Sequence, residues 1–162
     1  MTTTETSWLS DQEQRVWRQW IRASWALPAE LNRHLQEFSL SMQDYGVLVC
    51  LTDTESGQLR MSDLADLMHW DRSRLSHHIT RMSTRGLVER RHCAEDGRGA
   101  FVAVTDQGRA SIERAAQRHV DGVRELFFDG MTEDEMRALE SVTSRLLERL
   151  ESDKRPGGAA QA

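Results

Sequence analysis

The amino-acid sequence predicts a mainly α fold with a small β-hairpin wing, and three observations lead to this prediction. Two short helix-forming segments lie between residues 62 and 85 and are separated by a polar break. Two β-type segments follow, on either side of the turn Asp96-Gly97-Arg98-Gly99. Longer amphipathic segments precede and follow this central region. We therefore expect about six helices around one hairpin.

The N-terminal part of the chain is expected to form two helices. Ser10-Asp11-Gln12-Glu13 is a capping-box pattern, and apolar residues then recur at helical spacing as far as Phe38. Pro28 lies inside this first helix and removes a backbone donor, so we expect a kink or break near Ala26. Ser41-Met42-Gln43-Asp44 opens the second helix, whose apolar residues are expected to be buried: Tyr45, Leu48 and Leu51.

The central region has the order of a winged helix-turn-helix. A short strand-like bridge at 58–61 leads into helices at 62–68 and 72–85, the second of which ends at Gly86. The hairpin strands are expected at 87–91 and 101–105. In this fold the second helix enters the DNA major groove, and the hairpin reaches the neighbouring backbone or minor groove.

The C-terminal part is expected to form two further helices. Thr105 caps the first, which runs to about Phe128 and ends at Asp129-Gly130. Thr132-Glu133-Asp134-Glu135 is a second capping box and opens the last helix. Residues 152–162 are small and polar, which is typical of a disordered tail.

Composition limits the classes of function. The 162 residues are 38% hydrophobic and 29% charged, with no apolar run near the 18 or so residues of a membrane span. The N-terminus has no signal-peptide core, so we expect a cytoplasmic protein with no membrane partner. The two cysteines, Cys50 and Cys93, match no zinc or CxxC spacing. We find no phosphate loop, nucleophile elbow or catalytic His/Asp cluster, and therefore expect no enzyme, cofactor or metal.

The distribution of charge points to nucleic acid, although the whole chain carries −5. Residues 72–109 contain eight arginines and four acids, a local charge of +4 that leaves −9 for the remainder. An acidic body with a basic lobe can bind DNA through one face and stay soluble through the rest.

The outer helices suggest how the chain assembles. We expect a helical dimerisation lobe from residues 10–38 and 106–151, a DNA-binding lobe from 39–105, and the tail at 152–162. A two-fold dimer would place two recognition helices about 34–36 Å apart, one turn of DNA. The alternative is that these helices only cover the core of a monomer.

Several stretches resemble the MarR family of bacterial transcription regulators. They are Leu64-Ala65-Asp66-Leu67, Arg72-Ser73-Arg74-Leu75-Ser76-His77, Arg85-Gly86-Leu87-Val88-Glu89-Arg90, and Asp96-Gly97-Arg98 followed by Val102-Ala103-Val104-Thr105-Asp106-Gln107-Gly108. The resemblance covers residues 10–151. It implies a homodimer on a palindromic operator in double-stranded DNA, usually a repressor, often released by a small phenolic or anionic ligand.

The recognition helix and the wing carry the expected DNA contacts. Leu75, Ile79 and Met82 should face the core, which leaves the other faces for DNA. Arg74 and His77 are the best candidates for base edges, because Arg can bridge guanine O6 and N7. The full set of expected contacts is Arg72, Ser73, Arg74, Ser76, His77, Arg81 and Arg98, with Asp96 supporting the wing. For each of these arginines the alternative is a solvated surface side chain.

The resemblance also implies a ligand pocket between the two lobes. Candidate residues are Trp17, Trp20, Trp25, His34, Tyr45 and His119, and the alternative for each tryptophan is the dimer core. Cys50 is expected to be buried, and Cys93 lies beside Arg91 and His92, which could lower its pKa. The leading hypothesis is a ligand-responsive transcription regulator. The alternative is an architectural DNA-binding protein without a sensor.

Overall fold

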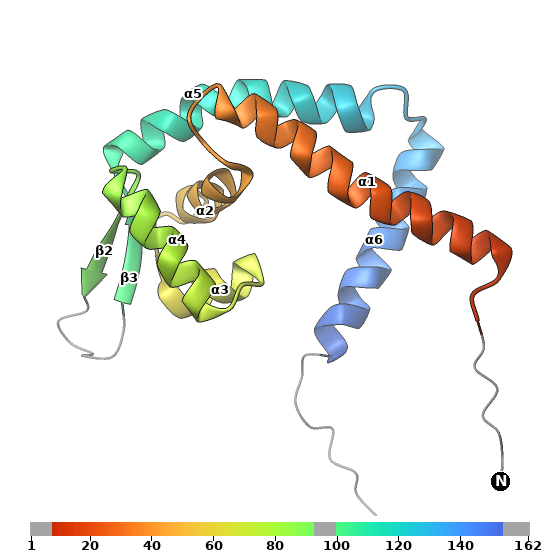
Figure 1. The fold of residues 1–162 in the computed structure, drawn as a ribbon, viewed down its shortest axis with the longest axis horizontal. Helices are drawn as coiled ribbons and strands as arrows, with labels where there is room; N and C mark the ends of the chain where they lie inside the picture. Colours follow the sequence, from red (N-terminus) through yellow and green to blue (C-terminus); the bar gives the residue numbers. More distant parts are fainter. Residues whose placement is uncertain (1–7, 93–99, 154–162) are drawn as a thin grey trace, which may run out of the picture. The chain divides into compact units, whose positions relative to one another are not determined.

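Six α-helices and three short strands form the described part of the computed structural model, residues 8–92 and 100–153 (Figure 1). The elements in order are α1 (Asp11–Gln36), α2 (Met42–Thr52), β1 (Gln58–Arg60), α3 (Met61–Met68), α4 (Arg72–Thr84), β2 (Val88–His92), β3 (Ala100–Val104), α5 (Asp106–Val123), the π-helical turn η1 (Arg124–Phe128) and α6 (Glu133–Asp153). The chain divides into two units, residues 1–126 and 127–162, which we describe separately.

The helix boundaries in the first unit follow from their caps. Ser10 and Ser41 each form a full capping box, with Glu13 and Asp44 respectively. Thr105 caps α5 by accepting from the Gly108 N–H. These three starts confirm the capping patterns predicted from the sequence.

Of the kink or break expected near Ala26, the break is wrong, because α1 continues through Pro28. Proline removes the N–H that would bond to the carbonyl of Ser24. Both Pro28 and Ser24 are exposed, so water can take the place of the missing donor. The lost hydrogen bond therefore costs little on this side of the helix.

The three strands form one antiparallel sheet in the order β1-β3-β2. Val102 of β3 pairs with Leu59 on one side and with Arg90 on the other. The strand-like bridge predicted at 58–61 is therefore the third strand of the wing sheet. The hairpin tip, residues 93–99, lies outside the described residues.

The core of the first unit gathers around α2 and α4. Leu48 and Leu51 of α2 and the predicted inner residues of α4, Leu75, Ile79 and Met82, are all fully buried. The C-terminal half of α1 runs beside α5 (Figure 1) and closes the core with Leu35. Gly122 of α5 allows this approach, since a Cβ there would lie 2.5 Å from His34 Nδ1.

The second unit contains α6, which begins at a third capping pair. Thr132 Oγ1 and its backbone N–H both donate to Glu135, each at 2.8 Å, as the sequence predicted. The helix extends to Asp153, two residues into the segment expected as tail; the remaining tail lies outside the described residues. Large apolar side chains stay exposed along it: Met136, Val142, Leu146, Leu147 and Leu150.

Candidate nucleic-acid interface

The recognition helix α4 is set up by the turn that precedes it. α3 ends at His69, whose backbone is left-handed (φ 51°), and the Trp70 N–H then donates to Ala65 O at 2.9 Å. Asp71 starts α4 by accepting from the Arg74 N–H at 2.7 Å. The helix α3, the tight turn and the capped helix α4 together form the helix-turn-helix expected from the sequence.

The outer face of α4 is polar and open. At about 100° per residue, Ser73 and His77 lie nearly opposite the buried Leu75, Ile79 and Met82. Both are exposed, as are Arg72, Arg74 and Arg81. Arg74 and Arg81 share one flank of the helix, and Ser76 lies on the other.

Ser76 is already engaged by the wing. Arg90 of β2 donates through Nη2 to Ser76 O at 2.6 Å, to Ser76 Oγ at 3.1 Å and to Thr80 Oγ1 at 3.0 Å. Arg91 instead pairs with Glu89 on its own strand. Arg90 anchors the wing strand to the recognition helix.

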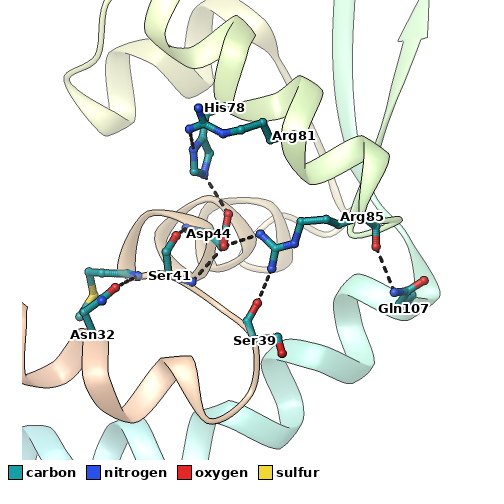
Figure 2. Close-up of polar contacts among 9 residues, drawn as sticks. Asn32, Ser39, Ser41, Asp44, His78, Arg81, Arg85 and Gln107 are labelled. Atoms are coloured by element: carbon teal, nitrogen blue, oxygen red, sulfur yellow. Dashed lines mark hydrogen bonds and ion pairs between the residues drawn. The ribbon is translucent and has the colours of Figure 1, made fainter.

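A buried carboxylate holds α4 against α2 (Figure 2). Asp44 has only 3% of its surface exposed. Its Oδ2 accepts from Arg85 Nη1 at 2.8 Å and from the Ser41 N–H at 2.9 Å, while its Oδ1 lies 3.1 Å from His78 Nε2. Arg85 also donates to the carbonyl of Ser39. One side chain thus joins the start of α2 to both the middle and the end of α4.

These contacts determine the charge state of Asp44. Burial alone would raise its pKa, but contacts with His78, Arg85 and Ser41 outweigh burial and hold the pKa well below its usual range. Asp44 is therefore an anion at neutral pH, balanced by Arg85.

His78 connects this carboxylate to the surface. Arg81 Nη2 lies 3.0 Å from His78 Nδ1. Since an arginine only donates, Nδ1 must accept, which leaves the ring proton on Nε2, the atom facing Asp44. The Nε2–Oδ1 distance suits a polar contact, although the direction of the N–H departs from that of a good hydrogen bond. His78 itself is buried, with 7% of its surface exposed.

The candidate ligand residues separate into two groups. His34, Tyr45 and His119 come together where α1, α2 and α5 meet: the rings of Tyr45 and His119 are 4.4 Å apart, and His34 lies against α5 at Gly122. Trp17, Trp20 and Trp25 are instead exposed. Trp20 precedes His34 by fourteen residues, about 21 Å along a helix.

The two histidines of this group have unsatisfied atoms. Nδ1 of His34 and Nδ1 of His119 are both buried and lack a hydrogen-bond partner among the described residues. Burial, and secondarily the nearby His34, lower the pKa of His119. Burial also raises the pKa of the Tyr45 hydroxyl. His119 and Tyr45 are therefore favoured in their neutral forms, beside buried nitrogen atoms that still need a partner.

The remaining site predictions concern the wing and the cysteines. Asp96, Arg98 and Cys93 lie outside the described residues. Cys50 is half-buried against the core; burial, and then the charge of Asp53, raise its thiol pKa, which makes it a poor nucleophile. Within 8–92 and 100–153 no group of three or more His, Cys, Asp or Glu side chains could hold a metal ion. None of the helices in those ranges is both long and apolar enough to cross a membrane.

Sequence reasoning missed the Asp44 network and the Arg90 anchor. The sequence shows Asp44 only as part of a helix-start pattern, and an acid in the first turn is favourable in any helix, so no local signal reveals its second role. Arg85 and Arg90 were counted as basic residues, and both turn out to be engaged within the protein.

The fold and this surface define the class of protein: a winged-helix transcription regulator. A family model described as transcriptional regulator SarA/Rot matches residues 31–115, just over half of the chain. The structure of AbsC, a MarR family transcriptional regulator from Streptomyces coelicolor, matches with a TM-score of 0.86 and 38% identity over 91% of this chain and 99% of AbsC. The chain therefore belongs to the MarR family, whose members are transcription regulators and not enzymes.

Two more relatives resemble the chain over different shares of its length. Sco3205, a MarR family regulator from Streptomyces coelicolor solved in complex with DNA, is 36% identical over 97% of both chains, with a TM-score of 0.86. YdgJ, an HTH-type transcriptional regulator of Bacillus subtilis, is 29% identical over 89 residues, which are 55% of this chain and 54% of YdgJ.

Proposed function

We propose that this regulator binds double-stranded DNA as a homodimer at a palindromic operator, and that it represses transcription there. The observation that carries the proposal is the exposed polar and basic face of α4, on a helix whose inner side is fixed by a fully buried core and by Asp44. A rigid helix with exposed Ser, His and Arg side chains is what major-groove recognition requires.

The expected homodimer is supported by apolar surface that a single chain leaves open. In α1, Val16, Trp17, Trp20 and Trp25 are between 46% and 71% exposed. α6 adds the five large apolar side chains described above. Exposed apolar surface of this extent marks an interaction site, and a second copy of the chain supplies the same helices as partners. Light scattering should give twice the chain mass of 18.6 kDa at micromolar concentration.

The cluster of His34, Tyr45 and His119 supports control by a small ligand. Two buried imidazole nitrogens have no hydrogen-bond partner among the described residues. Such a nitrogen can accept from a phenol, or donate to an anion in the tautomer that carries its proton there. A phenolic or anionic compound bound there would contact α1, α2 and α5 together, and would shift the operator affinity if it favoured one arrangement of these helices.

The test is selection of bound DNA from a random library, repeated with a panel of phenolic and anionic compounds. The proposal expects a two-fold symmetric consensus and a change in its affinity with at least one compound. A consensus that no compound affects would favour an architectural or constitutive DNA-binding protein. The absence of any consensus would contradict the proposed function.

A further inference from the structure

A hollow of about 380 Å³ lies on the flank of the recognition helix, between α4 and the start of α2. Its lining is mainly polar: Ser41, Gln43, Trp70, Arg74, His78 and Arg81. Arg74, His78 and Arg81 come from successive turns of α4, while Ser41 and Gln43 lie at the N-terminus of α2. This lining is unlike the apolar lining typical of sites for drug-like molecules.

Arg74 and Arg81 place two positive charges in this hollow, and neither has a carboxylate partner among the described residues. The arginines that do form ion pairs with carboxylates in the described ranges are Arg33, Arg85, Arg91 and Arg137. Asp44, which contacts the lining residue His78, is already balanced by Arg85. Asp71 accepts from the backbone N–H of Arg74. The hollow therefore carries net positive charge, supplemented by the partial positive charge at the start of α2.

Both arginines are held by neighbours rather than left free. The Arg74 guanidinium lies over the ring of Trp70, 4.4 Å from its centroid. Arg81 donates to His78, which in turn faces Asp44. Figure 2 shows this chain of contacts running from the α2 start to Arg81. Such support keeps long side chains in place and lowers the entropy lost when they bind a ligand.

We propose that this hollow is a phosphate-binding site in which Arg74 and Arg81 grip one phosphate group from either side of His78. The proposal rests on the proposed DNA-binding function for its preferred occupant, a backbone phosphate of the operator. Arg81 is then a binding residue, and His78 and Asp44 are positioning residues that act through it.

The location of the hollow favours DNA over a free phosphate. The outer stripe of α4, Ser73 and His77, is the part that would meet base edges, and the hollow lies on the flank beside it. When a helix enters the major groove, its flanks face the sugar-phosphate walls. Arg74, which sequence reasoning placed at a base edge, would then fix the helix in the groove without reading a base.

The first experiment compares the salt dependence of DNA binding for the full-length protein and its variants. For Arg74→Ala/Arg81→Ala, the log–log salt slope should become shallower by about two units per dimer, one for each shared phosphate, with parallel losses on selected and unrelated DNA. Arg81→Lys should keep most of the slope, because it keeps the charge. Arg33→Ala removes an exposed arginine of α1 as a control and should leave the slope unchanged. Circular dichroism checks that each variant is folded.

The second experiment separates the two sources of phosphate. Inorganic phosphate is titrated into the DNA-free protein while NMR follows the Gln43 amide and the arginine Nε–H groups. Shifts that disappear in the double variant, together with the shallower slope, support the site and its DNA occupant. Shifts with an unchanged slope would identify a site for free phosphate and overturn the DNA occupant.

Other results overturn the proposal outright. A slope change of about four units would mean that Arg74 and Arg81 bind two separate phosphates in each protomer. A changed base preference at constant slope would mean that Arg74 contacts a base. If phosphate causes no NMR shifts and the double variant keeps the wild-type slope, the hollow binds no phosphate. If the wild-type protein binds no DNA, the proposed function fails, while the phosphate titration still tests the hollow.

Discussion

His78 of the recognition helix lies with its Nε2 3.1 Å from Oδ1 of Asp44, a carboxylate at the start of α2 that is almost completely buried. Because Arg85 binds the other oxygen of the same carboxylate, the middle and the end of α4 are fixed to one point of the core. This point also caps α2 through Ser41. The orientation of the surface proposed to read DNA thus depends on a residue that cannot touch DNA.

Asp44→Ala is expected to destabilise the protein by about 3 kcal/mol, because it leaves His78 and Arg85 without their shared partner and removes part of the α2 cap. Chemical denaturation measures this change. Asp53→Ala, at the exposed C-cap of α2, should cost less than about 1 kcal/mol. Equal effects of the two substitutions would contradict a special role for Asp44.

The Asp44 network should also make stability depend on acid pH. Its pKa in the folded protein lies below the ordinary value of 3.8, so the contribution is fully present above about pH 4 and is lost as the pH falls through the folded pKa. Asp44→Asn should flatten the decline in the free energy of unfolding below pH 4. A variant that keeps the wild-type decline would assign the acid sensitivity to other carboxyl groups.

His119 should make stability depend on pH near neutrality as well. Its pKa is lowered from 6.5 by burial and by His34, so the unfolded chain takes up a proton before the folded protein does. Stability should therefore fall as the pH drops below about 6.5. Thermal unfolding of His119→Gln between pH 7.5 and 5 should show a smaller loss than the wild-type protein. An equal loss would exclude His119 as the source.

A pair of glycine substitutions tests the packing of the wing against α5. A Cβ at Gly108 would lie 2.1 Å from the carbonyl oxygen of Leu87, a backbone atom that cannot easily move, so Gly108→Ala should cost about 1–3 kcal/mol or more. Gly46→Ala, in the interior of α2, would meet only the flexible end of Met68 at 3.3 Å. Because alanine has a higher helix propensity than glycine, this variant should be as stable as the wild-type protein or up to about 1 kcal/mol more stable. Similar losses for both would contradict the close approach at Gly108.

Most of the fold was predictable because its signals are local. Capping boxes at Ser10, Ser41 and Thr132 and the apolar spacing of α4 determine where helices start and which face is buried. The break expected near Ala26 was the exception. The helix tolerates Pro28 because the affected carbonyl lies on an exposed side of the folded protein, and this exposure cannot be read from the sequence.

The site was predictable only in part, for a physical reason. Exposed side chains such as His77 follow from helical periodicity, whereas Asp44 and Arg85 are 41 residues apart and meet only through the packing of α2 on α4. The same holds for His34, Tyr45 and His119, which were candidates by resemblance and come together through α1, α2 and α5. Long-range polar contacts of this kind leave no periodic pattern in the sequence.

The central claim is that the outer face of α4 reads DNA. Its most direct test is selection from a random DNA library by the wild-type protein and by His77→Ala, with Arg33→Ala as a control. The account predicts a two-fold symmetric consensus with half-sites about one helical turn apart, which the control retains and His77→Ala relaxes at one base pair in each half-site. A consensus that is identical in all three proteins, or no consensus for the wild-type protein, would contradict it.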